Sequence, residues 1–265
     1  MRGIILAGGN GTRLYPMTKV VSKQLLPVYD KPMIHYALGT LMQTGIQEIL
    51  IICRSIDMES YKNLLGNGSN LGLKISYKEQ DIPGGLAEAF IIGEEFVNDE
   101  PVCLILGDNI FHGGSLTQTL LIASMGVLSN DKAIIFGCTV ADATRYGVIG
   151  FENGWPTSLE EKPTQPKSSY AVPGIYFYGK GVCAKAKTLG KSARGEKEIT
   201  DLNRMYLTEK KLSVIKLDSS VTWFDCGTPD SLLEASSFIQ AVQKRRGKIV
   251  ADLKAIAKYR GWINA

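Results

Sequence analysis

Short apolar runs alternate with amphipathic segments along the first half of the chain. Two runs of strand length, Gly3 to Ala7 and Glu48 to Cys53, flank a segment from Met33 to Gly45 with apolar side chains at helical spacing. The first run leads directly into a glycine-rich turn, as a buried parallel strand does. Together these segments predict a β-loop-α-β unit with a right-handed, parallel crossover.

A looser form of this alternation continues toward the C-terminus, with shorter strands from about Tyr146 onward. Further strands are expected near residues 74–78, 102–106, 133–140, 174–178 and 212–217. Helices are expected near residues 58–65, 85–96, 229–244 and 250–259. Strands that alternate with helices predict an α/β protein with an open, mostly parallel sheet and flanking helices.

Composition and charge describe an ordinary globular chain. Hydrophobic residues make up 45% of the 265 residues and charged residues 21%, and no repeat or low-complexity linker occurs, so we expect a single domain. The 30 basic and 26 acidic residues are spread along the chain, which argues against a nucleic acid or a membrane as a partner. The densest basic run, Lys244 to Lys248, is interpreted as the solvated face of a late helix.

Cysteine usage and the N-terminal residues both bear on location. The first three of the five cysteines lie in apolar, strand-like runs without metal-site spacing, which favours buried free thiols in a reducing compartment. The N-terminal apolar stretch is only four residues long before a glycine, and nowhere do eighteen apolar residues follow one another. We therefore expect a cytoplasmic protein.

The turn after the first strand carries the first candidate chemistry. Its glycines (Gly8, Gly9 and Gly11) let backbone N–H groups approach phosphate oxygens, and Thr12 and Arg13 add a hydroxyl and a fork of charged donors. The turn matches neither the dinucleotide fingerprint nor the P-loop. Taken alone it is as readily structural as phosphate-binding.

Two aspartates follow hydrophobic stretches at widely separated positions. Asp108 comes after the run VCLIL and a glycine, which places it at the carboxyl end of a buried strand, and Asp225 follows Trp223 and Phe224. A single aspartate of this kind is usually a helix cap or a turn residue. Two such carboxylates, however, are what Mg2+ requires when it keeps waters and bridges substrate phosphates.

The longest motifs resemble those of one enzyme family. The stretch LAGGNGTRLYPMT followed by SKQLLPVYDKPMI closely resembles the signature of the sugar-1-phosphate nucleotidyltransferases. Further matching segments are GLAEAF, LGDNIF, RYGV, LEEKP, SARGE with EITDLN, and DCGT, and the similarity runs from Arg2 to about Asn264. The resemblance implies a Rossmann-like sheet with a nucleotide-binding part (about 1–140), a smaller β-containing sugar-phosphate-binding part (about 141–228) and C-terminal helices (about 229–265).

The resemblance also implies roles for individual residues. Catalysis would rest on Arg13, Lys23, Asp108, Lys162 and Asp225, and Mg2+ would be held by Asp108 and Asp225. Nucleotide contacts would come from Leu6, Gly8, Gly9, Gly11, Thr12, Arg13, Lys23, Gln24, Gln80, Pro83, Gly85, Leu86 and Asp108, with Gln24 and Gln80 at the base. Sugar-phosphate contacts would come from Asn109, Gly147, Glu161, Lys162, Val172, Tyr176 and Arg194, the role of Arg194 being left open.

The reaction implied is in-line attack by a sugar-phosphate oxygen on the α-phosphorus of a nucleoside triphosphate, with pyrophosphate leaving. The resemblance favours dTTP and glucose 1-phosphate as substrates, dTDP-glucose for activated deoxysugars such as dTDP-rhamnose as the product, and a homotetrameric assembly. A uridylyltransferase that uses UTP is an alternative, because thymine and uracil differ by one methyl group. A non-catalytic, nucleotide-sugar-binding regulatory protein is a further alternative.

Overall fold

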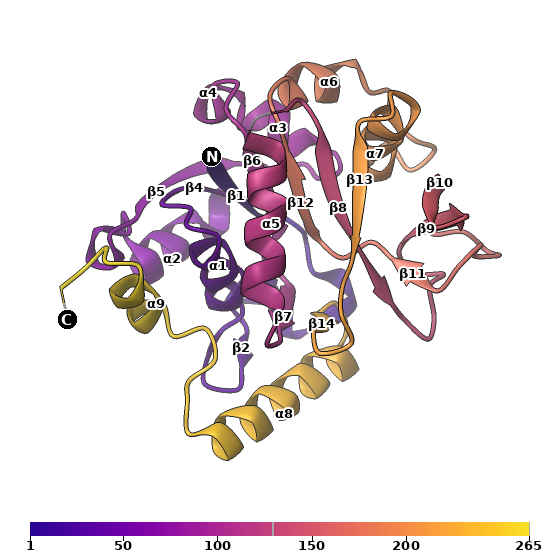
Figure 1. The fold of residues 1–265 in the computed structure, drawn as a ribbon. Coiled ribbons are helices and arrows are strands. Elements are labelled where there is room, and N and C mark those ends of the chain that lie inside the picture. Colours follow the sequence, from indigo (N-terminus) through magenta and orange to yellow (C-terminus); the bar gives the residue numbers. More distant parts are fainter. Residues whose placement is uncertain (129, 265) are drawn as a thin grey trace.

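A ten-stranded sheet runs through the computed structural model, which describes residues 1–128 and 130–264 (Figure 1). The strand order is β10-β9-β11-β8-β12-β6-β1-β4-β5, and β13 pairs with β8 beside this path. The strands are β1 (Arg2–Ala7), β4 (Glu48–Cys53), β5 (Lys74–Glu79), β6 (Val102–Leu106), β8 (Ala133–Thr139), β9 (Gly147–Glu152), β10 (Trp155–Glu161), β11 (Tyr170–Ala171), β12 (Ile175–Tyr178) and β13 (Leu212–Lys216).

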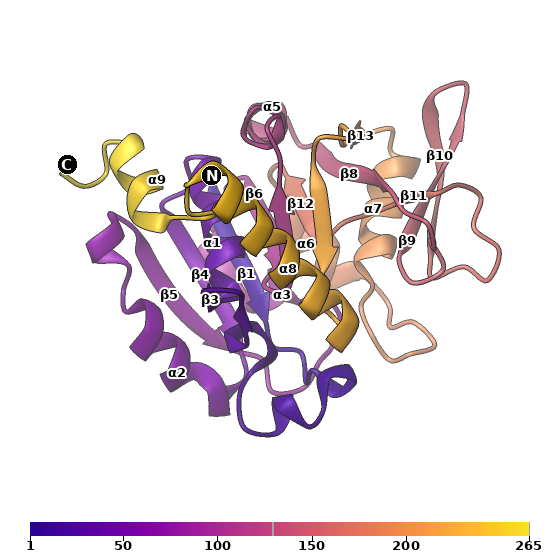
Figure 2. The same cartoon turned by 90° about the horizontal axis from the view of Figure 1, so that it is seen from below.

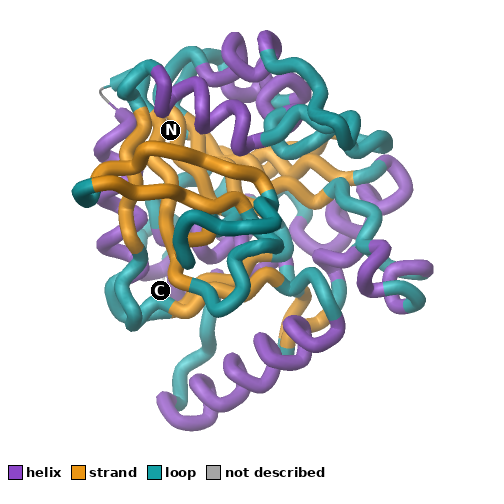
Figure 3. The backbone as a smooth tube through the Cα atoms, turned by 90° about the vertical axis from the view of Figure 1, so that its right-hand side faces the viewer, coloured by secondary structure: helices purple, strands orange, loops and turns teal. Residues whose placement is uncertain are grey.

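Strand directions confirm the predicted α/β class. Strands β5, β4, β1 and β6 are parallel neighbours, and β8 and β13 run the same way, whereas β12 between β6 and β8 is reversed. Strands β9, β10 and β11 extend the sheet by antiparallel pairs. They form the edge farthest from β5, which faces the viewer in Figure 3. Strands β9 and β10 have six and seven residues, so they are not shorter than the central strands, contrary to the expectation for this part of the chain.

Helices cover both faces of the sheet, which explains the continuous apolar runs. Ile5 belongs to a core cluster that includes residues of α1 (Ile34–Gln43) and α5 (Leu116–Leu128). Ile4, the preceding residue, belongs to a second cluster that includes residues of α3 (Glu88–Ile92), α6 (Val182–Thr188) and α7 (Ile199–Thr208). Because successive side chains point to opposite faces, a strand buried on both sides must be apolar throughout. The short helix α4 (Glu94–Val97) also contributes Val97 to this second cluster.

A third cluster forms around a two-stranded ribbon below the main sheet. Strand β7 (Asn109–His112) pairs antiparallel with β14 (Thr222–Asp225), and α8 (Pro229–Arg246) packs against the ribbon through Phe224 and Ile239. Figure 2 shows α8 crossing the lower side of the molecule. The other elements are β2 (Pro27–Val28), β3 (Lys31–Pro32), α2 (Ser55–Leu65), α9 (Leu253–Tyr259) and short 3-10 helices, including Thr12–Leu14 and Lys23–Leu25.

Several boundaries differ from those predicted. The helix expected over residues 85–96 is two short helices separated at Gly93, and the last helix begins at Leu253 rather than near residue 250. Helix α5 was not predicted because its apolar residues are not confined to one face, and Ile122 and Met125 are exposed. The basic run at the end of α8 is exposed, as interpreted.

The cysteines and the helices bear on the expected cytoplasmic location of the protein. All five cysteines are free thiols; four are buried, whereas Cys138 is partly exposed. Among the described residues, none of the helices combines the length and the apolar character that crossing a bilayer requires.

Candidate active site

The glycine-rich turn follows β1 and leads into the 3-10 helix Thr12–Leu14. Gly11 has φ 62°, a left-handed conformation that glycine adopts without strain, and its carbonyl accepts a hydrogen bond from Thr18 Oγ1 at 2.9 Å. A Cβ on Gly8 would lie 2.9 Å from Gln80 Oε1. The turn therefore packs closely against the residue predicted to read the base.

Lys23 and Asp108 form a direct ion pair at the carboxyl end of the sheet. Lys23 Nζ donates a hydrogen bond to Asp108 Oδ2, although 85 residues separate the two in sequence. Both side chains are largely buried. Burial raises the pKa of the Asp108 carboxyl, but the Lys23 ammonium and the hydrogen bond from Asn109 together outweigh that effect, so the pKa lies below its usual range.

The β7–β14 ribbon brings the second aspartate beside the first. Asp225 lies opposite Asn109 in the ribbon, and Cys226 N donates to the carbonyl of Asp108 at 3.1 Å. Burial and the negative charge of Asp108 raise the pKa of the Asp225 carboxyl. Two carboxylates that repel each other, with oxygen atoms available at a cavity wall, are a donor set that suits a hard divalent cation.

Both aspartates line a cavity of about 630 Å3, whose wall also includes residues of the 3-10 helix after the glycine-rich turn, of the β7–β14 ribbon and of α7. The predicted site residues that line it are Thr12, Arg13, Leu86, Asp108, Asn109, Gly147, Glu161, Lys162, Val172, Tyr176, Arg194 and Asp225. They come from both predicted parts of the chain. The fold thus gathers the predicted sugar-phosphate contacts and some of the predicted nucleotide contacts around one cavity.

The far end of this cavity is a network of charges around Glu161. Thr200 Oγ1 donates to Glu161 Oε2 at 2.5 Å, and Arg194 Nη2 donates to Glu161 Oε1 at 3.3 Å. Arg194 also pairs with Glu198 at 2.8 Å. Lys162 Nζ lies 3.7 Å from Glu161 Oε1 and is about half exposed. Cations and hydroxyl acceptors here suit an anionic, hydroxylated ligand.

Some predicted residues lie outside the cavity wall. Gln24 is buried, and its Oε1 accepts hydrogen bonds from Ser22 and Tyr61. Gln80 donates to Glu88 Oε2 at 2.6 Å. The predicted nucleotide-binding residues that are not part of the wall are Leu6, Gly8, Gly9, Gly11, Lys23, Gln24, Gln80, Pro83 and Gly85.

Sequence reasoning did not single out several residues of the wall. Arg145 lies 3.9 Å from Asp225, and the rings of Tyr146 and Trp223 lie 5.0 Å apart beside it. Arg145 and Tyr146 stand in the segment RYGV, and Thr200 and Glu198 in EITDLN, both of which contribute to the family resemblance. Those segments were the signal that could have identified these residues.

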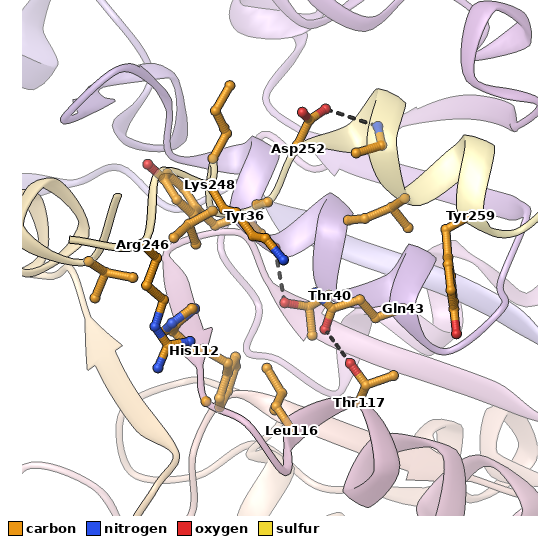
Figure 4. Close-up of a pocket in the computed structure, with 18 of the residues that line it drawn as sticks. Tyr36, Thr40, Gln43, His112, Leu116, Thr117, Arg246, Lys248, Asp252 and Tyr259 are labelled. Carbon is orange, nitrogen blue, oxygen red and sulfur yellow. Dashed lines mark hydrogen bonds between the residues drawn. The ribbon is translucent and has the colours of Figure 1, made fainter. Parts of the chain in front are cut away.

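A second cavity of about 410 Å3 holds none of the predicted site residues. It lies between α1, the start of α5, the end of α8 and α9. Figure 4 shows His112 and Arg246 on one side of it and Tyr259 on another. Its position makes it separate from the cavity that contains the two aspartates.

Comparison with known proteins identifies the family of this chain. The sequence profile of the nucleotidyl transferase family matches residues 2–242. The chain belongs to the nucleotidyl transferase family. A member from Neisseria meningitidis serogroup A, glucose-1-phosphate thymidylyltransferase, is 54% identical over 265 residues, which are all of this chain and 91% of that protein. The enzyme of the same name from Mycobacterium tuberculosis H37Rv is 49% identical, with the same coverage.

Solved structures of nucleotidyl transferases share the fold. A Bacillus anthracis protein assigned as a glucose-1-phosphate thymidylyltransferase, solved with sucrose, superposes with a TM-score of 0.82 at 41% identity. That match covers 90% of this chain and 94% of the other. A UDP-glucose pyrophosphorylase solved with UDP-glucose superposes with a TM-score of 0.80 at 26% identity, covering 92% and 99%. The same fold is therefore shared by relatives named for thymidylyl transfer and for UDP-glucose.

Proposed function

We propose that this nucleotidyl transferase moves a thymidylyl group from dTTP to glucose 1-phosphate, giving dTDP-glucose and pyrophosphate. The observation that carries the proposal is that Arg13, Asp108 and Asp225 line the same cavity as Glu161 and Lys162. A cavity that is cationic and carboxylate-lined at one end and hydroxyl-accepting at the other suits a triphosphate and a sugar phosphate together. The relatives that are about half identical over the whole chain carry that activity in their names.

We assign Asp108 and Asp225 as the residues that hold Mg2+. The described residues contain no cluster of three or more histidine, cysteine, aspartate or glutamate side chains suited to a metal, so phosphate oxygens and waters would complete the coordination. When bound, the ion supplies charge neutralisation at the phosphates. The repulsion that raises the pKa of Asp225 supports this assignment, because a cation would relieve it.

The residues at the triphosphate end would bind and orient the reacting phosphate. A Cβ on Gly227 would lie 2.9 Å from Arg13 Nη2, so the missing side chain leaves room for Arg13 beside Asp225. Arg13 and Lys23 would neutralise the triphosphate, and the backbone of the glycine-rich turn would donate to its oxygens. Since both reactants are anions, positioning and charge neutralisation carry the catalysis.

The residues at the other end would hold the nucleophile. Lys162 would pair with the phosphate of the sugar phosphate, and Glu161 would accept hydrogen bonds from sugar hydroxyls. Thr200 and Arg194 already fix the two oxygens of Glu161. We infer that Thr200 and Arg194 orient the Glu161 carboxylate before the sugar phosphate binds beside it.

Assembly, location and pathway are proposed from the family resemblance. We propose a homotetramer, a single domain whose three parts serve nucleotide, sugar phosphate and C-terminal packing, and a supply role for activated deoxysugars such as dTDP-rhamnose. Four buried free thiols support a reducing compartment such as the cytoplasm.

A substrate matrix tests the proposal. Purified protein is incubated with Mg2+, each of dTTP, UTP, ATP, CTP and GTP, and each of several hexose 1-phosphates, and pyrophosphate is measured. We expect the highest rate with dTTP and glucose 1-phosphate and none without a divalent cation. Faster release with UTP would favour the uridylyltransferase alternative. Absence of pyrophosphate from every pair would favour the regulatory protein.

A further inference from the structure

The side-chain amide of Asn109 joins three groups at the floor of the cavity. Trp223 Nε1 donates to Asn109 Oδ1 at 2.6 Å, and the backbone N–H of Gly174 donates to the same oxygen at 3.0 Å. Asn109 Nδ2 in turn donates to Asp108 Oδ1 at 2.8 Å. The asparagine is buried, with 3% of its surface exposed.

This arrangement fixes the orientation of the amide. An amide oxygen has two lone pairs, and the two N–H donors from Trp223 and Gly174 use both. The Nδ2 group must then face the opposite way, toward the carboxylate of Asp108. Rotating the amide by half a turn would set N–H against N–H at two contacts and leave Asp108 Oδ1 facing an oxygen.

The ribbon explains how a tryptophan reaches this amide. In the β7–β14 pairing, Asp225 lies opposite Asn109 and Trp223 lies opposite Phe111. Residues on one face of an antiparallel pair meet their diagonal neighbours two positions away when the side chains are long. The register that sets Asp225 beside Asp108 therefore also sets the indole N–H of Trp223 against Asn109.

A second aromatic ring packs against the indole of Trp223 at a tilt. The ring of Tyr146 lies 5.0 Å from that of Trp223, at an interplanar angle of 60°. Both residues line the cavity. The indole is thus held by its ring on one side and by its N–H on the other, which limits the positions that Asn109 can take.

We propose that Trp223 is a positioning residue for the metal site, acting through Asn109 on the carboxylate of Asp108. The proposal rests on the assignment of Asp108 as a metal-holding residue. Asp108 Oδ1 accepts from Asn109 while Oδ2 accepts from Lys23, so each oxygen has a fixed partner. Groups that orient a ligand in this way commonly change metal affinity by about 10- to 100-fold when removed.

Trp223→Phe tests the proposal because it keeps an aromatic ring against Tyr146 and removes the N–H. Mn2+ binding is followed by loss of the free-ion electron paramagnetic resonance signal, with dTTP at one fixed concentration in every sample so that its own metal binding cancels. We expect the dissociation constant for Mn2+ to rise about tenfold. Trp155→Phe, at a tryptophan that is 75% exposed, is the matched control and is expected to bind Mn2+ as the native protein does.

A double-mutant cycle identifies the route of the effect. Asn109→Ala removes the link to Asp108, and we expect Trp223→Phe to add less than twofold in that background, because residues acting through one another are not additive. An Mn2+ affinity unchanged in Trp223→Phe, or a tenfold loss repeated in the Asn109→Ala background, would overturn the proposal. Pyrophosphate release by the native protein is measured in parallel; its absence would count against the proposed function itself.

Discussion

Lys23 donates a hydrogen bond to Asp108, the carboxylate on which we place the metal. Without a bound cation the ammonium already neutralises this carboxylate, so a metal ion must compete with it. We therefore expect Lys23→Met to bind Mn2+ more tightly than the native protein when no nucleotide is present. The same variant should lose about two orders of magnitude in turnover, because the Lys23 ammonium that would neutralise the triphosphate is missing.

Lys19→Met is the matched control for this prediction. Lys19 is exposed and lies four residues earlier, so its removal lowers the net charge equally. Isothermal titration with Mn2+ measures both variants. Equal Mn2+ affinity in Lys23→Met and Lys19→Met would show that Lys23 does not occupy the metal position.

Asp225 should lower the stability of the metal-free protein at neutral pH. Its pKa is raised above 3.8 by burial and by Asp108. Stability from a carboxyl with a raised pKa is fully present below the unfolded value and is lost as the pH rises through the folded value. Asp225→Asn should therefore raise the thermal midpoint at pH 7, by about 2–4 °C for each kcal/mol recovered, and much less at pH 3.

Thermal melts at pH 3 and pH 7, without and with Mg2+ and dTTP, check this expectation. The variant should also lose the additional stabilisation that the ligands give the native protein. A gain of the same size at both pH values would indicate that charge is not the cause.

The central strands β1, β4, β6 and β8 were predictable because burial on both faces favours apolar residues along most of their length, whereas no bounds were predicted for β9 and β10. The run from Glu48 to Cys53 is a strand with the predicted bounds for this reason. Apolar residues on the exposed side of α5 obscured its helical period, and the last helix, α9, which packs against α1, begins later than predicted, at Leu253. Local composition does not indicate which helices pack against each other.

The site was predictable only as far as motifs extend. Asp108 and Asp225 were paired by resemblance, and the ribbon register explains why they meet. The place of Arg13 beside Gly227 depends on two segments more than two hundred residues apart, so no local pattern indicates it. For the same reason Trp223 and Asn109 could not be linked from their sequence positions.

Asp108→Asn tests the metal assignment at the level of activity. The amide keeps the size of the side chain but loses the charge, so we expect Mg2+-dependent pyrophosphate release to fall at least about a hundredfold. Glu59→Gln removes a carboxylate from the exposed side of α2 and serves as the control. Near-native turnover by Asp108→Asn at saturating Mg2+ would contradict the assignment.

Lys162→Ala should chiefly weaken use of the sugar phosphate. Lys162 has φ 45°, and because alanine carries the same Cβ, the backbone strain is nearly unchanged by the substitution. We expect the KM for glucose 1-phosphate to rise at least tenfold while the KM for dTTP changes little. Lys162→Arg should recover part of this loss, and Lys167→Ala, on an exposed lysine nearby, should leave both constants as they are. An unchanged KM for the sugar phosphate would remove Lys162 from the proposed role.

Competition between the two pyrimidine nucleotides tests the central claim most directly. The protein is given glucose 1-phosphate, Mg2+ and equal concentrations of dTTP and UTP, and the sugar nucleotides formed are separated and quantified by mass spectrometry. The extra methyl group of thymine contributes about 1–3 kcal/mol in a pocket that fits it. We expect dTDP-glucose to exceed UDP-glucose by about tenfold or more, whereas an excess of UDP-glucose, or the absence of both products, would contradict thymidylyl transfer to glucose 1-phosphate.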